Sequence, residues 1–137
     1  MKKIMICVIL FANFALAQMS ITYQTAASCN AVKCTPALLQ QANLITMNTG
    51  GSELTNILTI GGYSQTFYTS FKGTYILGDG SKALVSYARD DYGNSGTFVY
   101  ALSGAMLIIG GYSFLLYLDP NPDALYPYMK LIQNAVF

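Results

Sequence analysis

The chain has 137 residues, a length that suits one domain with its own hydrophobic core. Its net charge is only +1, so it lacks the basic excess that follows a nucleic-acid backbone, and no nucleic acid is expected as a partner. Histidine is absent, and the sequence contains no phosphate loop, dinucleotide fingerprint or set of zinc ligands. We therefore expect a protein that is not an enzyme and binds no metal or cofactor.

The first residues allow two interpretations. A basic start (residues 1–3) precedes an apolar run (residues 4–11), and an Ala-x-Ala sequence ends at Ala17. This order is typical of a cleaved secretory signal peptide, and the run is shorter than a membrane span. The run also fits a strand that is covered on both faces and followed by a return strand. We predict that residues 4–22 form two strands and are retained, and the alternative is that residues 1–17 are removed as a signal peptide.

Two cysteines, Cys29 and Cys34, leave the cellular compartment open. In a secreted protein they could close a small loop as a disulfide. In the cytosol both would be small apolar residues beside the start of a helix.

A helix is predicted over residues 36–48. Thr35 and Pro36 suit its N-cap and its first helical position. Leu38, Ala42 and Ile45 then recur at helical spacing, with polar side chains on the other face.

After this helix the pattern changes to strands separated by tight turns. The turns are rich in glycine, asparagine and aspartate, and Gly61-Gly62 and residues 78–81 are predicted as hairpin turns. Gly104 is predicted as a further turn. We predict strands over residues 57–60, 63–70, 74–77, 82–89, 97–103 and 105–112, with residues 113–118 continuing the last strand or bending away from it.

The C-terminal segment is predicted to be an amphipathic helix. Leu125, Met129, Ile132 and Val136 fall on one stripe, which should face a sheet. The expected fold class is therefore α+β: one domain over residues 1–137, with an antiparallel β-sheet, a middle helix and a C-terminal helix packed on the sheet.

From Tyr87 onward the sequence resembles profilins. The stretch Tyr87-Ala88-Arg89, a polar turn and two apolar segments, residues 96–102 and 104–110, look like the long C-terminal strands of that family. A final helix with Tyr126 in its first turn is also similar. The resemblance implies a profilin-like fold, a place in the cytoplasm and cytoskeleton, and regulation of the cytoskeleton by binding of monomeric actin.

The resemblance also implies site residues. Profilins bind actin through the Arg-bearing strands and the start of the last helix, and proline-rich segments between their terminal helices. This chain has no tryptophan, and two aspartates follow the arginine where the family has basic residues, so proline-rich segments and phosphoinositides are less expected partners than actin. The implied actin-binding residues are Arg89, Tyr126, Lys82 and Tyr87, and the implied remnants of a proline-rich site are Leu131, Ile132 and Phe137.

Each of these residues also has a purely structural interpretation, as a solvated strand end or as packing in a helix. Two other functions stay open. The eleven tyrosines and low charge suit a secreted, tyrosine-rich β protein with a structural or surface-binding role. A profilin-like subunit of a larger assembly is the third hypothesis, because a fold does not determine a function.

Overall fold

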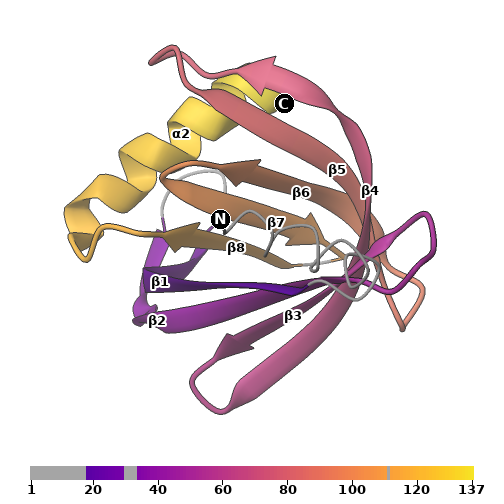
Figure 1. Ribbon diagram of the computed structural model, residues 1–137. Coiled ribbons are helices and arrows are strands. Elements are labelled where there is room, and N and C mark those ends of the chain that lie inside the picture. Colours follow the sequence, from indigo (N-terminus) through magenta and orange to yellow (C-terminus); the bar gives the residue numbers. More distant parts are fainter. Residues whose placement is uncertain (1–17, 30–33, 111) are drawn as a thin grey trace, which may run out of the picture.

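The computed structural model describes residues 18–29, 34–110 and 112–137. In this part of the chain, eight strands form a closed antiparallel barrel, and a C-terminal helix covers part of its outer wall (Figure 1). The elements in chain order are β1 (Gln18–Cys29), β2 (Cys34–Asn48), β3 (Leu54–Ile60), β4 (Tyr63–Ile76), β5 (Lys82–Asp90), β6 (Ser95–Ala101), β7 (Gly104–Ile109), β8 (Tyr112–Tyr117), the 3₁₀ turn η2 (Pro122–Ala124) and α2 (Leu125–Val136).

Every strand pairs with the next one along the chain, and the last returns to the first. Strand β1 pairs with β2 along most of its length, and its residues 25–28 also pair with β8, from Thr25 opposite Tyr117 to Ser28 opposite Phe114. The ladder between β1 and β2 shifts register after Tyr23, where β1 begins to pair with β8. Each described strand is thus paired on both sides over part of its length, which protects the sheet against edge-to-edge association.

Hydrophobic side chains fill much of the barrel interior, and they alternate with outward-facing ones along each strand. The rings of Phe67 and Phe98 are 5.3 Å apart between centroids. The buried residues of this interior cluster are Tyr23, Ala26, Ala42, Leu44, Leu58, Ile60, Phe67, Ala88, Phe98, Ala105, Leu107, Ile109 and Leu116.

A second cluster lies between α2 and the outer wall. Leu125, Met129 and Ile132 of the helix are buried together with outward-facing residues of β5 to β8, among them Val99 and Leu115. The Tyr128 hydroxyl donates a hydrogen bond to the Gly104 carbonyl oxygen at 3.1 Å. The predicted C-terminal helix and its apolar stripe are therefore confirmed, and the helix packs on the outside of the barrel.

The predicted profilin-like α+β fold with a middle helix is wrong. Residues 36–48 belong to β2, and Ala42 and Leu44 face the interior while Asn43 and Ile45 face outward. This segment pairs with strands on both sides, for example Asn43 with Thr22 and with Thr59. The segment is therefore a strand with two-residue alternation, although some of its apolar residues also fit helical spacing.

The predictions for the later strands are largely confirmed. Residues 57–60, 82–89 and 97–103 correspond to β3, β5 and β6, with shifted ends. The two strands predicted over residues 63–77 are one strand, β4, with an irregularity between Phe71 and Gly73.

The prediction for residues 105–118 needs correction. They form two strands, β7 and β8, that meet at a turn containing Gly110, and Gly104 begins β7 instead of making a turn. Of the N-terminal prediction over residues 4–22, residues 18–22 lie in β1, and the rest lies outside the described residues. No helix in the described ranges is long and apolar enough to cross a membrane.

Candidate functional site

One end of the barrel interior contains a cavity of about 280 Å³. It lies at the end where β1 begins and where β2 connects to β3, which we call the open end. Inward-facing side chains of six consecutive strands and one loop residue form its wall, and all of them are uncharged. They are Met19, Thr46, Ser52, Leu54, Asn56, Thr69, Phe71, Leu84, Ser86, Phe98 and Tyr100.

The cavity has an apolar rim and a buried floor. Phe71 is 65% exposed and Leu84 44% exposed, although both are large apolar side chains. Asn56, at 1% exposed, and the buried Thr69 lie deeper. Exposed large hydrophobic groups gathered at one place mark a binding surface more often than chance, and here they surround an opening.

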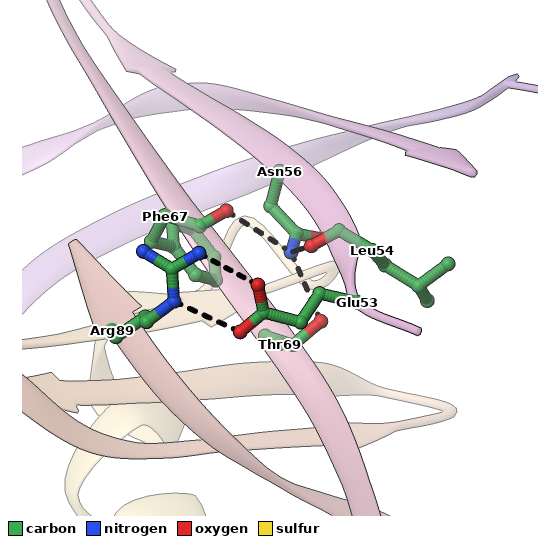
Figure 2. Close-up of polar contacts among 6 residues, drawn as sticks. All are labelled: Glu53, Leu54, Asn56, Phe67, Thr69 and Arg89. Atoms are coloured by element: carbon green, nitrogen blue, oxygen red, sulfur yellow. Dashed lines mark hydrogen bonds and ion pairs between the residues drawn. The ribbon is translucent and has the colours of Figure 1, made fainter. Parts of the chain in front are cut away.

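The floor is a small polar network centred on Asn56 (Figure 2). The Thr46 hydroxyl donates to Asn56 Oδ1 at 2.8 Å. Asn56 Nδ2 lies 3.1 Å from Thr69 Oγ1, 3.3 Å from the Leu54 carbonyl oxygen and 3.4 Å from that of Phe67. Because a buried amide without hydrogen bonds is costly, this network keeps a polar group stable inside an apolar barrel.

The position of Asn56 follows from the strand pattern. The inward row of β3 is Leu54, Asn56, Leu58 and Ile60, so Asn56 is the one polar member of an apolar row. The pairing register places Thr46 of β2 directly opposite Asn56. The network thus joins three neighbouring strands at one level of the barrel.

An ion pair lies on the outer wall beside the open end. Arg89 Nε donates to Glu53 Oε2 at 2.9 Å and Arg89 Nη2 to Glu53 Oε1 at 2.7 Å (Figure 2). The guanidinium also lies 4.5 Å from the centre of the Tyr68 ring. Such bidentate pairs are the most directional of salt bridges. Glu53 stands between Ser52 and Leu54, which line the cavity, so the pair fastens the loop between β2 and β3 to β5.

The hydrogen bond from Arg89 lowers the pKa of Glu53. A carboxylate whose pKa is lowered by folding contributes its stabilisation above its unfolded pKa and loses it as the pH falls through the folded value. The fastening of this loop is therefore complete at neutral pH and weakens only in acid, below the ordinary range of glutamate. The Arg89 side chain is exposed and that of Glu53 is partly exposed, so salt screens the pair.

Among the described side chains, Asp90 and Tyr23 are ionisable groups buried in the barrel, and neither lines the cavity. The Asp90 carboxylate accepts hydrogen bonds from the backbone N–H groups of Tyr92 and Asn94 and from the Asn94 side chain, which anchors the turn between β5 and β6. Burial raises the pKa of the Tyr23 hydroxyl far above its ordinary value, so this group is neutral at physiological pH. The cavity wall itself therefore presents no charge to a ligand.

The residues predicted for actin binding lie in two regions of the surface. Tyr87 and Arg89 are on the outer face of β5, but Arg89 is occupied by Glu53 and Tyr68. Lys82 begins β5, and Tyr126 is partly exposed in the first turn of α2.

The residues predicted for proline-rich ligands all belong to the C-terminal helix or its end. Ile132 is fully buried against the barrel, and Leu131 packs beside it. Phe137 is exposed at the C-cap of α2. Ile132 therefore reaches a ligand only if the helix leaves the barrel.

The cavity residues were missed because no motif marks them. One signal was present: Asn56 interrupts the inward apolar row of β3, and a polar residue at such a position is either costly or functional. Residues 18–29, 34–110 and 112–137 contain no group of three His, Cys, Asp or Glu side chains that could hold a metal ion.

A second, more polar hollow of about 240 Å³ lies at the opposite end of the barrel. It is lined by the start of β4, including Tyr63 and Gln65, and by Asp91 and Tyr92 of the turn between β5 and β6. Tyr92 is 89% exposed, so a ligand there would remain largely in water. The cavity at the open end is the better candidate because it removes apolar surface from water.

In the described ranges, the chain is a closed eight-stranded antiparallel barrel with an uncharged internal cavity and a C-terminal helix on its outer wall. Comparison of this chain with protein-family models, curated proteins and solved structures found no match.

Proposed function

We propose that this protein is a non-enzymatic binding protein that takes a small apolar molecule into the cavity of its barrel. The observation that carries the proposal is an uncharged cavity with an exposed apolar rim, enclosed by a continuous ring of strands. Eight-stranded barrels are just wide enough to be filled by side chains or to hold one small ligand. Scaling from a cavity of about 150 Å³ that binds benzene, the present cavity suits a ligand of about ten non-hydrogen atoms.

The test is a variant that fills the cavity. Ser86 lies inside β5, opposite Phe71 and Phe98, so Ser86→Trp places an indole where the ligand would lie. Calorimetric titration with naphthalene, a neutral and wholly apolar molecule, should give wild-type protein a Kd on the order of 1–10 µM. We expect Ser86→Trp to bind at least about tenfold more weakly.

The matched control is Ser20→Trp. Ser20 is exposed on β1 and hydrogen-bonds with Asn43 outside the cavity, so this variant should bind naphthalene like the wild type. Circular dichroism establishes that both variants are folded. Equal binding by wild type and a folded Ser86→Trp would show that the cavity is not the site.

Binding of monomeric actin stays a prediction that no feature described above tests. The fold that motivated it is different, and its main residue, Arg89, fastens the loop beside the cavity. Cavity binding is therefore the function that the geometry supports best.

We further propose that the protein is secreted. The eight described strands of the barrel lie at or beyond Gln18, so removal of residues 1–17 after the Ala-x-Ala sequence leaves each of them in place. Removal also takes away Cys7, so that two cysteines remain. Cys29 and Cys34 are directly opposite each other in the ladder between β1 and β2. Opposed residues in antiparallel strands have Cα atoms about 4.5–5.5 Å apart, within the range of disulfides.

We expect the native protein to begin at Gln18 and to contain a disulfide between Cys29 and Cys34. Intact mass spectrometry of protein from the source cell, alkylated with and without prior reduction, measures both. Alkylation should require reduction, and reduction should lower the free energy of unfolding by about 2 kcal/mol, the value for so short a closed loop. A native chain that begins at Met1 with freely alkylated cysteines would contradict secretion and leave cavity binding unaffected.

A further inference from the structure

The buried polar groups of the cavity lie at its inner end. Asn56 and Thr69 are buried there, whereas the exposed Phe71 and Leu84 surround the opening. If a small molecule binds in the cavity, as proposed above, its inner end meets buried hydrogen-bonding groups and its outer part meets mainly apolar side chains, besides Ser52 and Ser86. The contrast between a polar floor and an apolar opening restricts the chemistry of the ligand, whereas the volume of the cavity restricts only its size.

The network at the floor leaves a ligand one donor, the Thr69 hydroxyl, and acceptor capacity that includes Asn56 Oδ1. A carbonyl oxygen has two lone pairs, and Asn56 Oδ1 accepts a single hydrogen bond, from Thr46, among the described residues. Thr69 Oγ1 accepts from Asn56 Nδ2 at 3.1 Å, and its own hydroxyl hydrogen has no acceptor in the described part of the chain. The two groups are neighbours, because they belong to one network on adjacent strands.

The absence of charge from the wall determines what can bind these groups. The ion pair of Arg89 and Glu53 lies on the outer wall, and its two charges neutralise each other. A carboxylate or ammonium group at the floor would lose its hydration without meeting an opposite charge, which is costly. At the rim, a charged group would stay in water beside Phe71 and Leu84 and would leave the hydrogen-bonding groups of the floor without a ligand partner. A hydroxyl group, in contrast, can donate to Asn56 Oδ1 and accept from Thr69.

We propose that the ligand is a neutral molecule with a single hydroxyl group on an apolar body of about ten carbon atoms. The hydroxyl binds Asn56 and Thr69 at the floor. The apolar body lies between Phe98 and Tyr100 and extends toward Phe71 and Leu84 at the opening. A long-chain primary alcohol has this chemistry, and the matching carboxylate and amine do not.

The first experiment compares three molecules with the same alkyl chain. Calorimetric titration of the full-length protein with 1-nonanol, nonanoate and nonylammonium at neutral pH isolates the headgroup. We expect 1-nonanol to bind at least about tenfold more tightly than either charged molecule. Nonanoate that binds as tightly as 1-nonanol would overturn the hydroxyl assignment, while naphthalene binding that is lost in Ser86→Trp would still uphold cavity binding.

The second experiment removes one hydrogen bond. Thr69→Val keeps the shape of the side chain without its hydroxyl, and we expect about fivefold weaker binding of 1-nonanol with unchanged binding of naphthalene. Thr59→Val is the control, because Thr59 bonds Ser64 on the outer face of β4 and β3. Unchanged binding of 1-nonanol by Thr69→Val would overturn the placement of the hydroxyl. If neither naphthalene nor 1-nonanol binds wild-type protein, cavity binding and the ligand assignment both fail.

Discussion

Replacement of Gly96 by alanine is expected to destroy most of the stability of the barrel. Gly96 lies in β6, opposite Ala88 of β5 and Ile109 of β7. A Cβ atom at this position would overlap the carbonyl oxygen of Ile108 and lie 2.9 Å from the Cα atom of Ile109. These are backbone atoms of a paired strand, so they cannot move without breaking the ladder between β6 and β7. We expect a loss of roughly 4 kcal/mol or more.

Such a loss is a large part of the 5–15 kcal/mol by which domains are typically stable. Urea unfolding monitored by circular dichroism, together with the yield of soluble protein, measures it. Gly51→Ala is the matched control, because no heavy atom lies within 4 Å of its added Cβ, and it should change stability by less than about 0.5 kcal/mol. A wild-type unfolding midpoint for Gly96→Ala would show that β6 and β7 do not approach this closely.

Gly96 also illustrates which parts of the fold can be predicted from the amino-acid sequence. Most turns and strands between residues 57 and 101 were predicted, although β4 was predicted as two strands, because alternating side chains and glycine-rich turns are local patterns. The C-terminal helix was predicted for the same reason, since its stripe of Leu125, Met129 and Ile132 needs no knowledge of the rest. The close approach at Gly96 depends on the path of a second strand, and no local pattern contains it.

The wrongly predicted middle helix and the missed closure of the barrel have separate physical causes. The inward row of β2 contains Ala42 and Thr46 beside Leu44, so its two-residue pattern is weak and the helical spacing of other apolar residues dominates. Thr46 lines the cavity, so the same polar position that allows a ligand site also weakens the strand signal. Closure of the barrel joins residues 25–28 to residues 114–117, a contact between distant segments for which the sequence offers no local signal.

The cavity was unpredictable for a related reason. An open sheet and a closed barrel have the same alternation along each strand, and only closure turns one face into an interior. In an open sheet, Asn56 would be a polar residue on a solvated strand face, and Arg89 would be an exposed side chain available to a partner protein. Within the barrel, the first is a buried group at the floor of a cavity and the second fastens a loop beside its opening.

Truncation of Ile132 tests the second structural layer, the docking of α2 on the outer wall. Ile132 is fully buried in the cluster that also contains Val85, Val99 and Met129. Ile132→Ala leaves a cavity between the helix and the barrel, and we expect it to lower the free energy of unfolding by about 2–5 kcal/mol. The cost arises on the outside of the barrel wall, so the affinity for naphthalene of the folded variant should remain that of the wild type.

The matched control on the same helix is Asn134→Ala, because Asn134 is exposed and alanine favours a helix. This variant should unfold within about 0.5 kcal/mol of the wild type. Urea unfolding at one temperature, followed by circular dichroism, compares the three proteins, and naphthalene titration below the transition measures binding. Wild-type stability of Ile132→Ala would mean that α2 is not docked as described. A loss of naphthalene affinity in the folded variant would mean that the outer helix supports the cavity, which would connect the two clusters through the wall formed by β5 and β6.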